Sequence, residues 1–191
     1  MQFTKLEIPD VVLCEPVVHG DDRGYFFESF RHDRLSDFIG YDLNFVQDNE
    51  SKSSKGVLRG LHCQLPPHAQ TKLVRVIEGA VLDIAVDIRH GSPTFGKHVS
   101  MLLSADNKRQ LLIPRGFAHG FVVLSDSAVF TYKVDNYYNV DSERAILFSD
   151  PDLKIDWQLN ESEIMLSGKD SVSKLLSESP KYFSYDEDYY A

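Results

Sequence analysis

The sequence predicts an all-β protein with the architecture of a jelly-roll barrel. Short segments rich in β-branched and aromatic residues follow one another along most of the chain, as in an antiparallel sandwich or barrel. The breaks between them, such as "HGDDRG", "LPPHAQ" and "HGSPTFG", contain the Gly, Pro and Asp residues that turns require. The predicted strands are 11–18, 24–30, 57–64, 71–79, 81–89, 98–104, 109–114, 119–125 and 128–134.

The predicted strand at 81–89 shows a regular alternation. Leu82, Ile84 and Val86 alternate with the charged residues Asp83 and Asp87. Because successive side chains of a strand point to opposite faces, this alternation predicts one face in the core and the other in water.

Helical pattern is scarce. Residues 31–40 are expected to form two helical turns, and residues 169–178 a short C-terminal helix. No internal repeat or low-complexity linker divides the chain, so residues 1–191 are expected to form a single domain. Within it, residues 1–50 would supply N-terminal strands, and residues 160–191 a C-terminal helical segment and tail.

Composition limits the classes of partner. The formal net charge of −9 comes with no basic block, which argues against nucleic acid or an anionic membrane as a partner. The N-terminal "MQFTKLEIPD" lacks the apolar stretch of a signal peptide, and no apolar run is long enough for a membrane helix. Cys14 and Cys63 form no CxxC pair and predict no disulfide framework. The chain is therefore expected to be cytoplasmic.

The segment "GVLRGLHCQLPPHAQTKLVRVIEG", residues 56–79, is the first with a chemical signature. Regular strand geometry would place Gly60, His62 and Gln64 on one face, together with Leu58, and Lys72 on the inner face of the next strand. A second histidine, His119, comes from "IPRGFAHGF", which keeps the spacing P-x-G-x-x-H. The two segments resemble the two cupin motifs, which supply a metal ion with His, His and Glu from the first and His from the second.

The residues at the four matching positions are His62, Gln64, Lys72 and His119. An ammonium group would repel a divalent cation, and an amide is a weak substitute for imidazole. We therefore expect no metal and no other cofactor, and a barrel mouth that is free for acid–base chemistry on an organic substrate.

A longer series of segments resembles one family. "DDRGYFFESF", "FVQDNESKSSKGVLRGLH", "AQTKLVRVIEGAVLDIAVDIRHGSPTFG", "IPRGFAHGF", "FTYKVDNYY", "DPDLKIDW" and "LSGKD" are similar, in this order, to the dTDP-4-dehydrorhamnose 3,5-epimerase family. Cys63 is a departure, since the family more often has an aromatic residue there. The resemblance implies an isomerase that inverts C3 and C5 of a dTDP-4-keto-6-deoxyhexose, without a redox cofactor and as a homodimer.

The same resemblance implies roles for individual residues. His62 would be the base, Tyr132 the acid, Asp170 the partner that orients the histidine, and Lys72 the cation at the developing oxyanion. These roles suit the residue types, because imidazole accepts protons near neutral pH whereas a phenol stays protonated. The residues implied in substrate binding are Arg23, Glu28, Gln47, Asn49, Arg59, His119, Glu143 and Lys169, with Tyr138 as a candidate to stack on the base.

Several alternatives remain open at this stage. Arg59 and His62 are three residues apart, so either Gly60 lies in a bulge or Arg59 serves another site, across a dimer for example. Asp170 on its own is compatible with a helix N-cap, and Tyr132 with a half-buried strand residue. The same fold could also serve a mono-epimerase, a 3,4-ketoisomerase, a metal-dependent cupin or a sugar-binding module without catalysis.

Overall fold

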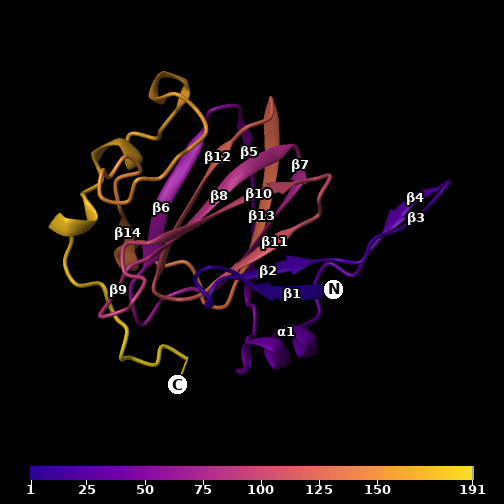
Figure 1. The fold of residues 1–191 in the computed structure, drawn as a ribbon, viewed down its shortest axis with the longest axis horizontal. Coiled ribbons are helices and arrows are strands. Elements are labelled where there is room, and N and C mark those ends of the chain that lie inside the picture. The colour runs from indigo at the N-terminus through magenta and orange to yellow at the C-terminus, as the bar shows by residue number, and fades with distance from the viewer. Residues whose placement is uncertain (191) are drawn as a thin grey trace.

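The computed structural model describes residues 1–190 and shows two antiparallel sheets packed face to face as a jelly roll (Figure 1). The first sheet has the strand order β1-β2-β11-β7-β13-β5, and the second has the order β10-β8-β12-β6-β14. The strands of the first are β1 (Gln2–Lys5), β2 (Val12–Glu15), β11 (Gln110–Ile113), β7 (Lys72–Glu78), β13 (Ser127–Val134) and β5 (Gln47–Ser54). Those of the second are β10 (His98–Ser104), β8 (Ala80–Asp87), β12 (Phe117–Val123), β6 (Leu58–Gln64) and β14 (Glu143–Ala145). The predicted all-β jelly roll is confirmed.

Three apolar clusters hold the sheets and their coverings together. The first fills the space between the sheets, where Val74 and Phe130 of the six-stranded sheet meet Val81 and Phe121 of the five-stranded sheet. The second lies on the outer face of the five-stranded sheet, under the C-terminal segment that contributes Trp157. The third joins the outer face of the six-stranded sheet to the N-terminal part of the chain. The five-stranded sheet is thus buried on both faces.

The prediction of a wet face on the strand at 81–89 is wrong. Asp83 and Asp87 of β8 are both 0% exposed. Leu82, Ile84 and Val86 belong to the outer cluster, whereas the neighbours of Asp83 on the opposite face, Val81 and Ala85, belong to the cluster between the sheets. The alternation therefore separates two buried faces, because the C-terminal segment covers the face that a two-layer barrel would leave in water.

Strand β6 contains a bulge. His62 pairs with His119 of β12, but Arg59 pairs with Phe121, so three steps along β6 match two along β12. Gly60 lies inside this shift with a φ of 131°, a conformation that favours glycine. The extra residue breaks the predicted period of two and turns Arg59 and His62 toward the same cavity.

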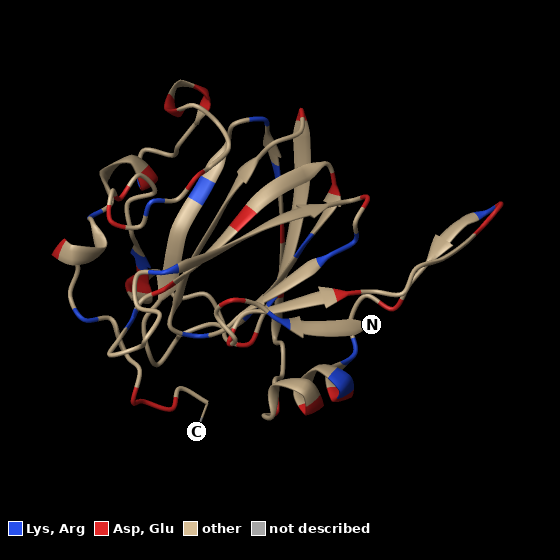
Figure 2. Cartoon of the chain, viewed as in Figure 1, with Lys and Arg blue, Asp and Glu red and all other residues tan. Residues whose placement is uncertain are grey.

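The N-terminal region carries a helix and a projecting hairpin. The predicted helix at 31–40 is confirmed as α1 (His32–Ile39), and it ends at Gly40 in the left-handed conformation. The segment 24–30, predicted as a barrel strand, forms only β4 (Gly24–Phe26), which pairs with β3 (His19–Asp21). Figure 1 shows this hairpin extending away from the barrel, and Figure 2 shows acidic and basic residues together at its tip.

The predicted C-terminal helix at 169–178 is wrong. The segment forms two short 3-10 turns, Asp170–Val172 and Leu176–Glu178, separated by extended residues, and further such turns lie at Val140–Ser142 and Glu161–Glu163. Parallel bridges at Val57–Met165 and Ile146–Lys174 tie the segment to the barrel, so its backbone is held in an extended path that a helix would shorten. The chain ends with β15 (Phe183–Ser184) along β9 (Arg89–His90).

Among residues 1–190, the helices are all too short or too polar to cross a bilayer.

The bulge at Gly60 leads to a stability prediction. A Cβ atom at this position would lie 2.8 Å from the carbonyl oxygen of His119 and against the backbone of Gly120, in addition to the strain of the positive φ. We expect Gly60→Ala to lower the free energy of unfolding by about 2–4 kcal/mol, as measured by urea denaturation. Gly168→Ala is the control, since its Cβ would meet nothing within 4 Å and should change stability by less than about 0.5 kcal/mol. Equal stability of the two variants would contradict this account of the bulge.

Candidate active site

A cavity of about 620 Å³ opens between the two sheets and the C-terminal segment. All four residues predicted as catalytic line it: His62 from β6, Lys72 from β7, Tyr132 from β13 and Asp170 from the C-terminal segment. Of the predicted substrate-binding residues, Asn49, Arg59, His119, Glu143 and Lys169 also line it. Residues separated by more than a hundred positions in the sequence thus share one concave surface, which is the usual form of a small-molecule site.

His62 and Asp170 form a tightly hydrogen-bonded pair. The distance from His62 Nε2 to Asp170 Oδ1 is 2.5 Å, and the Asp170 side chain is only 5% exposed. The Ser167 hydroxyl donates to Asp170 Oδ2 at 2.9 Å, so both carboxylate oxygens are engaged. Because Nε2 faces the carboxylate, Nδ1 is the ring nitrogen left for a ligand.

The pair accounts for the charge state of Asp170. Burial by itself would raise the pKa of this carboxyl, but the hydrogen bonds from His62 and Ser167 and the nearby cations outweigh burial and lower the pKa below its ordinary value. Lys169, rather than Asp170, occupies the N-cap position of the 3-10 turn. The side chain of Asp170 therefore serves His62, and the cap interpretation is wrong.

Lys72 and Tyr132 come from neighbouring strands of the six-stranded sheet. Burial lowers the pKa of Lys72, against the opposing effect of Cys63, Asp83 and Glu143. Burial raises the pKa of Tyr132, against the opposing effect of the Arg59 guanidinium. Tyr132 therefore keeps its proton at neutral pH, whereas burial disfavours the charged form of Lys72 and the neighbouring acidic groups favour it.

Arg59 is directed into the same cavity by the bulge. Its Nε donates to the hydroxyl of Ser53 at 3.1 Å, and Ser53 is only 7% exposed. This hydrogen bond anchors the guanidinium through Nε. Planar guanidinium groups suit phosphate oxygens because they donate in pairs. Of the two alternatives for Arg59, the structure shows the bulge at Gly60, and Arg59 lies on the wall of the cavity that also contains His62.

A second histidine–aspartate pair lies deeper in the barrel. His119 Nε2 is 2.9 Å from Asp83 Oδ2, with Asp83 0% exposed. His119 is also the cross-strand partner of His62, so the two imidazoles are neighbours on the inner face of the five-stranded sheet. Sequence reasoning placed Asp83 in water and so missed it. Its only signal was a carboxylate inside an otherwise apolar run.

The rim of the cavity is organised around Glu143. Its carboxylate meets Lys169 Nζ at 2.5 Å and accepts a hydrogen bond from the Tyr138 hydroxyl at 3.0 Å. Gln47 donates to Asn49 Oδ1 at 2.8 Å and accepts from the Tyr138 backbone at 3.2 Å. Tyr138 and Gln47 do not line the cavity, but they are hydrogen-bonded to Glu143 and Asn49, which do. The Tyr138 ring is exposed at the edge of the cavity.

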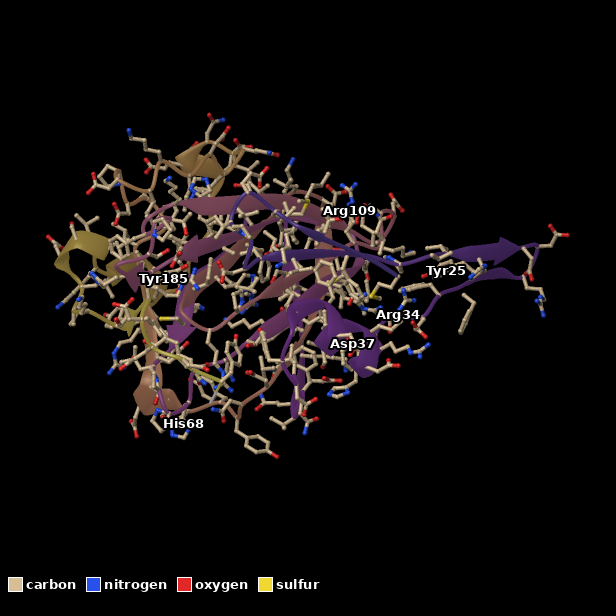
Figure 3. All side chains as sticks on the ribbon, turned by 60° about the horizontal axis from the view of Figure 1, so that its bottom comes forward. Tyr25, Arg34, Asp37, His68, Arg109 and Tyr185 are labelled. Atoms are coloured by element: carbon tan, nitrogen blue, oxygen red, sulfur yellow. The ribbon has the colours of Figure 1, made fainter. Side chains whose placement is uncertain are left out.

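Arg23 and Glu28 are not brought to this cavity. Arg23 lies on the projecting hairpin, with its side chain 90% exposed and paired with Asp21. Glu28 is exposed on the segment that leads back to α1. Figure 3 shows Tyr25 on the same hairpin, and Lys108 Nζ, from the turn between β10 and β11, lies 4.1 Å from the centre of its ring.

The residues at the cupin ligand positions do not fit a metal ion. Gln64 donates to the backbone carbonyls of His68 and Tyr137, and its amide oxygen accepts from the Asn139 backbone at 2.7 Å. Its amide thus holds the loop that carries Tyr138, while Lys72 adds a positive charge to the set. In the described part of the chain, no three His, Cys, Asp or Glu side chains lie close enough together to share a metal ion.

The fold and the cavity define a jelly-roll enzyme with paired acid–base groups, suited to proton transfer on an organic substrate. The sequence profile of dTDP-4-dehydrorhamnose 3,5-epimerase matches residues 5–178. The enzyme of this description from Shigella flexneri is 57% identical over 170 residues, which cover 89% of this chain and 93% of its own. This chain therefore belongs to the dTDP-4-dehydrorhamnose 3,5-epimerase family and is an isomerase of that type.

Solved structures support the same assignment. A dTDP-6-deoxy-D-glucose-3,5-epimerase from Legionella pneumophila, in complex with dTDP-4-keto-L-rhamnose, superposes with a TM-score of 0.93 and 48% identity, covering 97% of this chain and 99% of its own. A 3'-monoepimerase from Streptomyces bikiniensis, in complex with dTDP-quinovose, superposes with a TM-score of 0.85 and 34% identity, covering 90% and 86%.

The low pKa of Asp170 leads to a prediction for stability against pH. Because the folded-state pKa lies below the ordinary value of roughly 3.9, the ionised carboxylate stabilises the fold above that pH, and this stabilisation is lost as pH falls through the folded-state pKa. We expect Asp170→Asn to lower the free energy of unfolding by about 1–3 kcal/mol at pH 7. The difference from wild type should shrink below pH of roughly 4. Urea denaturation of both proteins at several pH values measures it, and a difference that stays constant with pH would contradict the assignment.

Proposed function

We propose that this protein inverts C3 and C5 of a dTDP-4-keto-6-deoxyhexose, with His62 as the base and Tyr132 as the acid. The observation that carries the proposal is the placement of these two residues on different sheets, β6 and β13, facing one cavity. Inversion requires a proton to leave one face of the carbon and another to arrive at the opposite face. A base and an acid on opposite walls meet that requirement.

The first step is removal of a carbon-bound proton. The C4 ketone acidifies the hydrogens at C3 and C5, and the free Nδ1 of His62 accepts one of them. Asp170 holds the ring by Nε2 and stabilises the imidazolium that forms, as the carboxylate of a catalytic triad does. The electron pair of the C–H bond moves into the C3–C4 or C4–C5 bond, and the negative charge develops on the C4 oxygen.

Lys72 stabilises that oxyanion. Lys72 lies on the cavity wall that also carries His62 and Tyr132. Buried groups surround it, so little water screens a positive charge at this position. Tyr132 then donates its phenolic proton to the opposite face of the carbon. The proton on His62 and the tyrosinate are reset by exchange with solvent, and a second cycle at the other carbon completes the double inversion.

The remaining cavity residues suit the nucleotide. Arg59 presents paired donors for the diphosphate, and the exposed ring of Tyr138 at the rim is available to stack on the base. The ligands named for the Legionella and Streptomyces proteins are dTDP-sugars, which supports the same class of substrate here.

The similarity to a 3'-monoepimerase supports a second candidate, inversion at C3 alone. Incubation with the 4-keto sugar nucleotide in deuterated water, followed by NMR, separates the two. Deuterium at both C3 and C5 supports double epimerisation, and deuterium at C3 alone supports the mono-epimerase. Binding without any deuterium uptake would indicate a sugar-binding module, and formation of a 3-keto isomer would indicate a ketoisomerase. Dependence of activity on stoichiometric iron, manganese or zinc would overturn the role given to Lys72.

The roles of the base and the acid predict different defects. We expect His62→Ala to abolish deuterium uptake, since the proton has no acceptor, with a fall in rate of at least about 100-fold. We expect Tyr132→Phe to retain some deuterium uptake but to form little inverted product, because His62 can return a proton only to the original face. His68→Ala and Tyr182→Phe are matched controls outside the cavity and should behave as wild type. Normal uptake in His62→Ala, or normal product yield in Tyr132→Phe, would refute the respective assignment.

The projecting hairpin supports the expected homodimer. It exposes Tyr25 and Phe26 at 62% and 72%, and it carries the predicted substrate residue Arg23 away from its own cavity. We infer that the hairpin packs on a second copy and brings Arg23 and Glu28 to that copy's site, with burial of the exposed rings as the driving force.

Mixed dimers test this arrangement. If Arg23 acts in the partner's site, a dimer of one Arg23→Ala chain and one His62→Ala chain contains one site without either defect. Random mixing of the two inactive chains by co-expression should then restore roughly a quarter of wild-type activity. If the hairpin serves its own chain, every site keeps one defect and no activity returns. Native mass spectrometry verifies that mixed dimers form.

A further inference from the structure

A fully buried carboxylate lies directly behind His119, a residue of the cavity wall, and has no role in the scheme above. Asp83 is 0% exposed, and its Oδ1 is the one buried side-chain oxygen or nitrogen in the described residues that has no hydrogen-bond partner. A buried, half-satisfied carboxylate is costly, and it persists where it serves a site rather than the fold.

The neighbours of Asp83 on β8 and on the adjacent strands are apolar. Its neighbours on the inner face of β8 are Val81 and Ala85, and its cross-strand partners are Met101 and Phe121. All four belong to, or pack against, the apolar cluster between the sheets. An apolar side chain of similar size would fit this environment without the cost of desolvating a charge.

Two polar groups approach the carboxylate from other elements. His119 of β12 meets Oδ2 through Nε2 at 2.9 Å, which makes Nε2 the protonated nitrogen and leaves Nδ1 as an acceptor. Lys72 of β7 lies on the opposite sheet, and the charges of Lys72 and Asp83 act on each other. The other titratable groups that face Lys72 are Cys63 of β6 and Glu143 of β14.

We propose that Asp83 is a positioning residue of the active site, which holds the His119 ring in one orientation and acts as the buried counter-ion of Lys72. Its free oxygen Oδ1 supplies the negative field, and its bound oxygen Oδ2 fixes the imidazole. The sugar then meets an ammonium that keeps its charge at C4 and a neutral imidazole that offers Nδ1 to a hydroxyl group.

Burial favours the neutral form of Lys72, of His119 and of Asp83. Burial lowers the pKa of Lys72 and of His119, and it raises the pKa of Asp83. The negative charge of Asp83 opposes the loss of charge by Lys72, while His119 remains neutral and donates to the carboxylate. Removal of that charge without a change of shape should therefore lower the pKa of Lys72.

The test compares two isosteric substitutions on one strand. Asp83→Asn removes the carboxylate charge behind His119. Asp87→Asn is the matched control, because Asp87 is also 0% exposed on β8 but accepts from Arg89, Ser92 and Thr94, away from the cavity. For Asp83→Asn we expect kcat to fall about 10-fold, the size of effect seen when an orienting partner is lost, and the basic limb of the kcat profile to move to lower pH. For Asp87→Asn we expect a lower Tm but a wild-type kcat and pH profile.

A second readout requires no turnover, which matters because this inference rests on the role proposed for Lys72. NMR of the protein with 13C-labelled lysine follows the titration of Lys72 Cε directly, and its signal is assigned with Lys72→Arg. Asp83→Asn should shift that titration to lower pH, whereas Asp87→Asn should leave it in place. A shifted lysine titration with unaltered turnover would refute the positioning role of Asp83, although Asp83 would still be the counter-ion of Lys72. That result would also contradict the role proposed for Lys72 in the reaction.

A further variant separates charge from fold. In a Lys72→Arg background the cation keeps its proton at all working pH values, so Asp83→Asn should no longer move the basic limb. The proposal is overturned if Asp83→Asn in the wild-type background lowers only Tm, with kcat, pH profile and lysine titration unchanged. It is equally overturned if Asp87→Asn produces the same kinetic and titration changes.

Discussion

One extra residue in β6 determines the geometry of the active site. Arg59 and His62 are separated by three positions, and a regular strand would direct them to opposite faces of the sheet. The shift in pairing with β12 at Gly60 turns both into the cavity. The bulge is possible because Gly60 adopts a positive φ and because Gly120 across the ladder leaves room for its backbone. A guanidinium and an imidazole are thereby brought to one cavity by a single strand.

The other side chains of the site are charged groups buried in a barrel whose five-stranded sheet is covered on both faces. Such an environment raises the cost of each unpaired ion and strengthens each pair. His62 is paired with Asp170, His119 with Asp83, and Glu143 with Lys169. Lys72 lines the cavity without a short contact of this kind in the described chain, so its amino group is available to a ligand.

The C-terminal segment contributes as much to the site as the barrel does. It covers the outer face of the five-stranded sheet with Trp157, Leu176 and Phe183, and the same segment delivers Asp170 behind His62. Folding and assembly of the site are therefore linked, because the apolar contacts that cover the sheet also position the carboxylate. The aromatic tail extends this covering, with Tyr190 hydrogen-bonded to Thr71 and its ring packed at a tilt against Tyr41.

The sequence by itself determined the jelly-roll class and the helix at 31–40, because strand periodicity and turn residues are local properties of the chain. The cupin-like motifs singled out His62 and Lys72, and the resemblance of the longer series of segments to the family added Tyr132 and Asp170; all four line one cavity. It did not predict β5 (Gln47–Ser54), whose polar residues lack the apolar signal of a strand, and it placed a helix at 169–178 where bridges to the barrel impose an extended path. Only the tertiary structure decided that Arg59 shares the cavity with His62, that Arg23 does not reach it, and that Asp83 is buried. Each of these depends on a bulge, a projecting hairpin or a covering layer contributed by residues far away in the chain, which no local pattern contains.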